Sequence, residues 1–156
     1  MDFPGDWSSL LHDLGRLLAA YGLAIPIGWY REKEAHSIGL RTFPLVAMAS
    51  CAYVLLAAAP GATNYENQSR VIQGLVAGIG FIGGGAILKA QGNVHGTATA
   101  ASIWNTGVLG AAVAQDRFVL AILLAGMNLV ALRVLLPLKM KLDAREGRET
   151  EPGEPK

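Results

Sequence analysis

Charged residues are scarce in this chain. Asp, Glu, Lys and Arg make up 16% of its 156 residues, whereas soluble domains average about 25%. The charges that are present lie between long apolar runs, and the formal net charge is only +1 at pH 7. A net charge so close to zero, without a clustered basic stripe, argues against a nucleic-acid partner. This pattern is typical of an integral membrane protein and not of a water-soluble globule.

Residues for metal binding or catalysis are also sparse. The one cysteine, Cys51, excludes an internal disulfide or a cysteine-metal cluster. The three histidines, His12, His36 and His95, do not have the spacing of metal ligands. No Ser/His/Asp or Cys/His arrangement is placed for nucleophilic chemistry, and no apolar run supplies the carboxylates that a magnesium site uses. We therefore expect neither enzyme activity nor a cofactor nor a metal site.

Five apolar runs dominate what is there, and each approaches the ~20 residues that a helix needs to cross a bilayer. We expect helices over about residues 14–30, 44–59, 71–88, 97–114 and 118–136. The fold class that follows is an all-α integral membrane bundle of about five transmembrane helices. Residues 1–138 form this domain, and residues 139–156 form a polar, disordered tail.

The connections between the runs are polar. Residues 31–41 are expected to form a charged loop, residues 62–69 a polar loop and residues 89–96 a short turn that pivots at Gly92-Asn93. Pro26 should kink or end the first helix, and Arg16 can pair with Asp13 three residues earlier. Thr42 can cap the second helix. Gln115-Asp116-Arg117 predicts a tight turn between the last two helices.

Basic residues predict the orientation. Asp2, Asp6 and Asp13 stand in place of the basic start of a secretory signal, so the first run is expected to remain as a helix. With the N-terminus outside, the outer side carries Arg16, Arg70 and Arg117, and Arg133 lies in the last span. The inner side then holds the larger set Arg31, Lys33, Arg41, Lys89, Lys139, Lys141, Arg145, Arg148 and Lys156. This excess predicts that the N-terminus faces out and the C-terminus faces in.

The third run is rich in glycine. A glycine destabilises a water-exposed helix by about 1 kcal/mol relative to alanine. In a membrane, however, small residues let neighbouring backbones approach closely, as Gly74-xxx-Gly78 and Gly80-xxx-Gly84 would allow. We expect a tightly packed transmembrane helix with Gly80 against a neighbour. The G-x-G-x-x-G match over residues 78–83 is not read as a nucleotide site, because the apolar run continues unbroken through it.

Three blocks of residues resemble the MgtC/SapB family of bacterial inner-membrane proteins. They cover most of the chain, from about Leu14 to Arg133. The first block is Gly28, Arg31, Gly39, Leu40, Arg41 and Thr42; the second is Arg70, Gln73 and the run GIGFIGGG at residues 78–85; the third is Val94, Gly96 and the run TAASIW at residues 99–104. The chain departs from the family pattern at Tyr30, where a glutamate is usual, and at Gly84, His95 and Ala98.

The resemblance implies a multi-pass protein of the bacterial inner membrane that is tied to growth under magnesium limitation and, in some pathogens, to survival inside host cells. Some relatives restrain the F-type ATP synthase. Longer members carry a soluble C-terminal domain, and we expect none here. The candidate functional or packing residues are Arg41, Arg70, Gln73, Gly78, Gly80, Gly83, Gly85, Gly96, Thr99, Trp104 and Asn105.

Two functions remain open. The first is a non-enzymatic regulator that acts on a membrane protein partner such as the ATP synthase. The second is a small ion transporter or channel subunit, for instance for magnesium. Polar groups within the spans (Gln73, Asn105, Thr106, Asn128 and Arg133) more often bond between helices than line a path. The bilayer and a second copy of the chain are the other expected partners.

Overall fold

The structure is a computed structural model that describes residues 7–35, 39–58, 65–90 and 93–135. It contains five α-helices, of which the fifth continues into a π-helix, and one short antiparallel hairpin. The elements are α1 (Trp7–Ala35), α2 (Thr42–Ala57), α3 (Tyr65–Gly85), β1 (Leu88–Ala90), β2 (Asn93–His95), α4 (Thr97–Ala114), α5 (Phe118–Val130) and the π-helix η1 (Ala131–Leu135). The predicted all-α bundle is confirmed.

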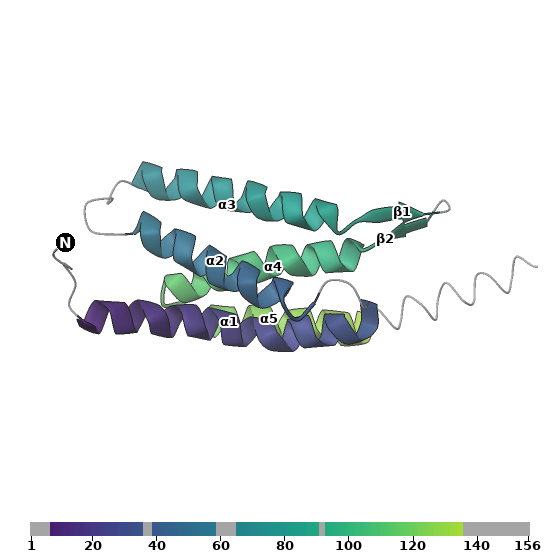
Figure 1. The fold of residues 1–156 in the computed structure, drawn as a ribbon, viewed down its shortest axis with the longest axis horizontal. Coiled ribbons are helices and arrows are strands. Elements are labelled where there is room, and N and C mark those ends of the chain that lie inside the picture. Colours follow the sequence, from purple (N-terminus) through teal and green to yellow (C-terminus); the bar gives the residue numbers. More distant parts are fainter. Residues whose placement is uncertain (1–6, 36–38, 59–64, 91–92, 136–156) are drawn as a thin grey trace, which may run out of the picture.

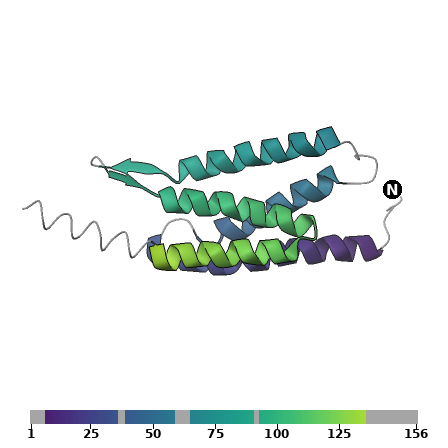
Figure 2. The same ribbon diagram turned by 180° about the vertical axis from the view of Figure 1, so that it is seen from behind.

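The helices lie side by side along one long axis, and β1 and β2 project from one end (Figure 1). We call this the hairpin end, and we call the opposite end, where residues 115–117 join α4 to α5, the turn end. Helix α4 occupies the middle and contacts all four other helices. Helix α3 lies at the edge of the bundle, against α4 and α2 (Figure 2).

The core is built largely from small side chains. Among the fully buried residues are Ala20, Ala24, Ala47 and Ala121, whereas Phe81 is 86% exposed. Small side chains let helix backbones approach closely, and the tightest approach is between α2 and α4. There, a Cβ atom on Gly110 would collide with the backbone of Ala47.

Helix α1 is longer than predicted. It passes through Pro26 and ends at Ala35, so residues 31–35 are helical and do not begin a loop. A proline removes one backbone hydrogen bond, but packing of α1 on α2 and α4 sustains the helix beyond it. The chain then folds back at Gly39, where a Cβ on Gly28 would lie 3.0 Å from the Gly39 carbonyl oxygen. The Leu40 N–H donates to Glu32 Oε2 over 3.1 Å and closes this connection.

Helix α3 begins before the predicted polar loop is complete. Residues 65–69 are already helical, because Glu66 and Arg70 form an ion pair at 2.8 Å with the i,i+4 spacing that supports a first turn. At its other end, α3 stops at Gly85, short of the predicted Leu88. Thr42, which was expected to cap α2, is already the first residue of that helix; the N-cap position is held by Arg41, which makes no side-chain capping hydrogen bond.

The predicted turn at residues 89–96 is a β-hairpin in the structure. Leu88 pairs with His95 and Lys89 with Val94. Gly96 follows with φ +87, and the Ala86 carbonyl oxygen occupies the space that a Cβ on Gly96 would need. Glycine adopts this left-handed conformation without the steric cost that other residues meet. The predicted pivot at Gly92 and the tail over residues 139–156 lie outside the described residues.

An ion pair closes the turn end. Arg16 Nη1 lies 3.4 Å from Asp13 Oδ1, which confirms that predicted pair. Arg16 Nε also donates to Asp116 Oδ1 over 2.9 Å, across 100 residues of sequence. This hydrogen bond lowers the pKa of the Asp116 carboxyl group. The predicted tight turn is confirmed, and Asp116 takes a left-handed φ of 58 within it.

Among the described residues, one helix segment (Trp7–Lys33) is by itself long and apolar enough to cross a membrane. Thr42–Ala57 and Phe118–Val134 are shorter apolar helices.

Candidate functional site

Polar side chains gather along one face of α4, the central helix. Thr99, Ser102 and Thr106 recur at spacings of three and four residues, which places them on the same side of a helix. All three are buried. Because α4 contacts every other helix, this face meets its partners from α1 and α5 inside the bundle.

Arg31 on α1 reaches this face at the hairpin end. Its side chain is 6% exposed, and within the described part of the chain it is the charged residue that the bundle buries. The Arg31 Nη2 group donates a hydrogen bond to Thr99 Oγ1. A buried charge is costly unless it is hydrogen-bonded or paired, so this contact helps to keep the guanidinium inside.

Further along α4, hydrogen bonds tie this helix to α5. Ser102 Oγ donates to Asn128 Oδ1 over 2.9 Å. Within α4 itself, Thr106 Oγ1 donates to the Ser102 carbonyl oxygen one turn earlier over 2.8 Å. Asn105 Nδ2 donates to the Leu124 carbonyl oxygen over 3.2 Å. We call this set the polar seam: Arg31, Thr99, Ser102, Asn105, Thr106 and Asn128.

Apart from the bond of Thr106 within α4, the polar seam is a set of interhelical contacts. Its hydroxyl and amide groups bond to one another or to backbone carbonyls, so they fix how α1, α4 and α5 sit together. No group of three or more His, Cys, Asp or Glu side chains that could hold a metal ion occurs among the residues that the structure describes. What the seam can do chemically is hold helices in register.

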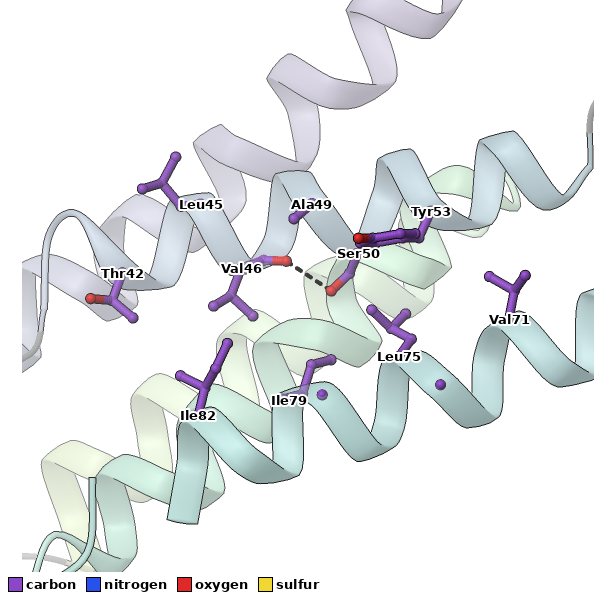
Figure 3. Close-up of a pocket in the computed structure, with 12 residues that line it drawn as sticks. Thr42, Leu45, Val46, Ala49, Ser50, Tyr53, Val71, Leu75, Ile79 and Ile82 are labelled. Carbon is purple, nitrogen blue, oxygen red and sulfur yellow. Dashed lines mark hydrogen bonds between the residues drawn. The ribbon is translucent and has the colours of Figure 1, made fainter. Parts of the chain in front are cut away.

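An apolar groove lies outside this core, between α2 and α3 (Figure 3). Its volume is about 730 Å³. Its polar lining residues are Thr42, Ser50 and Tyr53, and the Ser50 hydroxyl already donates to the Val46 carbonyl oxygen of its own helix over 2.7 Å. The remaining lining residues are Leu45, Val46, Ala49, Val71, Gly74, Leu75, Gly78, Ile79 and Ile82. The groove therefore suits an apolar occupant.

The predicted site residues do not converge on one place. Thr99 and Asn105 belong to the polar seam. Gly83 and Gly96 are close-approach positions, since a Cβ on Gly83 would lie 3.3 Å from the Ala100 carbonyl oxygen. Gly78 lines the groove. The others lie on the surface, namely Arg41, Gln73, Gly80, Gly85, Trp104 and Arg70, the last of these paired with Glu66.

The expectation that Gly80 packs against a neighbouring helix of its own chain is wrong. Nothing lies within 4 Å of a Cβ built there, and the same holds for Gly74, Gly78, Gly84 and Gly85. Helix α3 turns its side chains at Ile79 and Ala86 inward, and most of its glycines consequently point away from the bundle. Of the glycines in α3, only Gly83 approaches another element within that distance.

The sequence-based list of candidates did not include Arg31, Ser102 or Asn128. The charged character of residues 31–41 predicted a loop, and the burial of Arg31 was therefore not predicted. A signal for the seam was present nonetheless, because three hydroxyl side chains share one face of an otherwise apolar helix. Their partners on α1 and α5 are distant in sequence and could not be identified from local spacing.

Comparison with known proteins points to one family. The MgtC family model matches residues 17–141. Protein SrpB of Synechococcus elongatus is 38% identical over 121 residues, which cover 70% of this chain and 65% of that protein. Protein MgtC of Brucella abortus is 35% identical over 104 residues, covering 67% of this chain and 43% of that protein. The protein named "Putative magnesium transporter YhiD" of Escherichia coli is 32% identical over 133 residues, covering 81% and 62%.

The chain therefore spans less than two thirds of the length of these curated relatives, from 43% to 65%. No solved structure matches it. The matched region contains the whole polar seam and both walls of the groove.

Proposed function

We propose, from the premise that this chain belongs to the MgtC family, that it is a non-enzymatic, multi-pass protein of the bacterial inner membrane. It supports adaptation to magnesium limitation by acting on a membrane protein partner such as the F-type ATP synthase. Its N-terminus faces out, and its hairpin end faces the cytoplasm.

The distribution of side chains supports placement in a membrane. Large apolar side chains cover the outside, including Phe81, Val119, Leu56 and Met127, each at least 70% exposed. Soluble monomers rarely expose such extended apolar surface, whereas lipid accepts it. The 16 residues of α2 span about 24 Å at ~1.5 Å per residue, near the ~30 Å of a hydrocarbon core.

The observation that supports action through a partner is that the groups of the polar seam are already hydrogen-bonded within the bundle. Ser102 and Asn105 already have partners on α5, as packing contacts would, and Thr106 bonds to the backbone of its own helix. A path for a hydrated ion needs polar groups that face water or the ion. Arg31 stands at the hairpin end of the same seam, and its positive charge would repel a divalent cation there.

The alternative is a small ion transporter or channel subunit. The name given to YhiD, which refers to magnesium transport, favours it. The buried Arg31 favours it as well, because ionisable residues inside membrane bundles commonly mark ion pathways. In that case Arg31 would lie on the route or gate it.

Growth at low magnesium tests the proposal. A strain that lacks its own family member is given this chain or its Arg31→Met variant, and the protein is affinity-purified from membranes of both. We expect the wild-type chain to restore growth and to co-purify ATP synthase subunits. Failure of the accumulated wild-type protein to restore growth would overturn the link to magnesium, and growth without any co-purified membrane protein would overturn action through a partner.

A further inference from the structure

The outward face of α3 is unusual because it is nearly flat. Gly74, Ala77, Phe81 and Gly85 follow one another at three- and four-residue spacings and share this face, and all are exposed. Cβ atoms built at Gly74 and Gly85 would meet nothing within 4 Å. Phe81, at 86% exposed, is the single large side chain that projects from it. The face therefore has room for close backbone contact on both sides of one protruding ring.

The α2/α3 groove continues from this face. Gly74 and Gly78 form part of its α3 wall. It runs from Thr42 to Tyr53 along α2, about 16 Å at ~1.5 Å per residue. An apolar groove of this length suits one side of an apolar helix, as in helix-in-groove recognition.

We propose that a second copy of this chain docks on this surface, with its α3 lying against α3 and at the mouth of the groove. In a two-fold dimer the same patch serves both copies. Residues of equal depth in the membrane then meet, so the Gly74-xxx-Gly78 segments cross backbone to backbone. The Phe81 ring of each copy lies over the glycine-lined surface of the other. This association goes beyond the proposed function and rests only on the membrane placement within it.

Charge at the turn end is complementary to itself. Glu66 and Arg70 form an exposed ion pair on α3, with side chains 64% and 73% exposed. A two-fold axis beside α3 brings the two pairs together, so that each arginine can also face the glutamate of the other copy. The combined cluster is neutral, which suits an identical partner better than a predominantly acidic or basic one.

Gln73 favours a protein over a lipid acyl chain as the occupant of the docking face. It lies on the exposed side of α3, next to Gly74 and flanking the docking face. An amide that faces hydrocarbon lacks hydrogen-bond partners and is costly. An acyl chain cannot supply them, whereas the same amide of a second copy, at the same depth, can both donate and accept.

Cysteine cross-linking in native membranes tests the dimer. In a Cys51→Ala background, Ala77→Cys places one thiol on the docking face. Met127→Cys, 70% exposed on α5 at the opposite side of the bundle, is the control for random collisions. Under a mild oxidant we expect a covalent dimer from Ala77→Cys and monomer from Met127→Cys. Equal cross-linking of both variants would overturn the proposal.

A matched glycine pair tests the close contact. Gly78→Leu and Gly22→Leu both add a side chain where a Cβ meets nothing within 4 Å of its own chain. Gly78→Leu should reduce the Ala77→Cys dimer by about tenfold, while Gly22→Leu on α1 leaves it unchanged. An unchanged dimer in Gly78→Leu would contradict the arrangement. Native mass spectrometry that finds a monomer with one phospholipid, lost in Gly78→Leu, would assign the groove to lipid instead.

Discussion

Arg31 combines two properties that rarely occur together, a positive charge and burial in an apolar bundle. It reaches Thr99 across 68 residues of sequence, so α1 and α4 must meet at one register for the bond to form. Replacing one partner of a buried charged group leaves the other incompletely solvated. The hydroxyl of Thr99 is therefore a stabilising group for the hairpin end.

Thr99→Val removes that hydroxyl at nearly constant volume. We expect the free energy of unfolding to fall by about 1–3 kcal/mol, the cost of an unsatisfied buried polar group. Thermal unfolding in detergent measures it. Thr97→Val, the same change two residues earlier at an exposed position, should have little effect. Equal melting temperatures for the two variants would mean that the hydrogen bond from Arg31 to Thr99 does not stabilise the fold.

A second pair of variants compares an amide in the polar seam with an amide outside it. Asn105 donates to the Leu124 carbonyl oxygen over 3.2 Å, whereas Gln73 is exposed on α3. Asn105→Leu should lower stability by about 0.6–1.7 kcal/mol, the range for hydrogen bonds between membrane helices. Gln73→Leu should not lower the stability of the single chain. A larger loss in Gln73→Leu than in Asn105→Leu, again by thermal unfolding in detergent, would reverse this assignment.

At the scale of the helix, α4 is the element that the sequence predicts best, and its observed bounds, Thr97–Ala114, agree with the prediction. A left-handed glycine before it and a polar turn after it delimit it sharply. The last turn of α1 and the first turn of α3 were not predicted, because tertiary contacts and an ion pair extend these helices past local polar signals. The hairpin was missed because three-residue strands have too few residues to show a periodic pattern.

The glycines of α3 also differ in what surrounds them. Gly83→Leu should destabilise the bundle by about 1–3 kcal/mol, because a Cβ there already lies 3.3 Å from the Ala100 carbonyl oxygen. Gly80→Leu should be tolerated in detergent, since it meets open space and leucine favours a helix more than glycine does. Thermal unfolding of the two variants decides the matter, and a larger loss in Gly80→Leu would show that α3 is rotated from the orientation described.

For the whole molecule, large apolar side chains such as Phe81 are exposed on the outside, while the core combines alanines with Phe43 and Leu109. The sequence predicted the helical bundle from its hydrophobic runs alone. It predicted Thr99 and Asn105 as site residues and named Asn128 among the polar groups that bond between helices. It did not predict the burial of Arg31, because which helices face each other is a long-range property. It also could not predict that most of the glycines of α3 point outward.

The orientation of the chain in the membrane is a property of the whole molecule. In a Cys51→Ala background, Asn67→Cys lies near the start of α3 and Val94→Cys lies in the hairpin, and both positions are exposed. The excess of Lys and Arg at the hairpin end predicts that an impermeant thiol reagent labels Asn67→Cys in intact cells and labels Val94→Cys only after lysis. The reverse pattern would place the N-terminus inside.

The central claim is that this family member acts on a partner and does not itself conduct ions. The direct measurement is magnesium uptake by liposomes that contain the purified protein and a trapped magnesium-sensitive dye. The hydroxyls and amides of the polar seam are bonded to one another and to backbone, and Arg31 lies at the hairpin end of the seam. Magnesium uptake should therefore equal that of empty liposomes. Circular dichroism of the same preparation shows that the protein is folded. Magnesium entry that rises with the amount of protein and changes in Arg31→Met would contradict the claim.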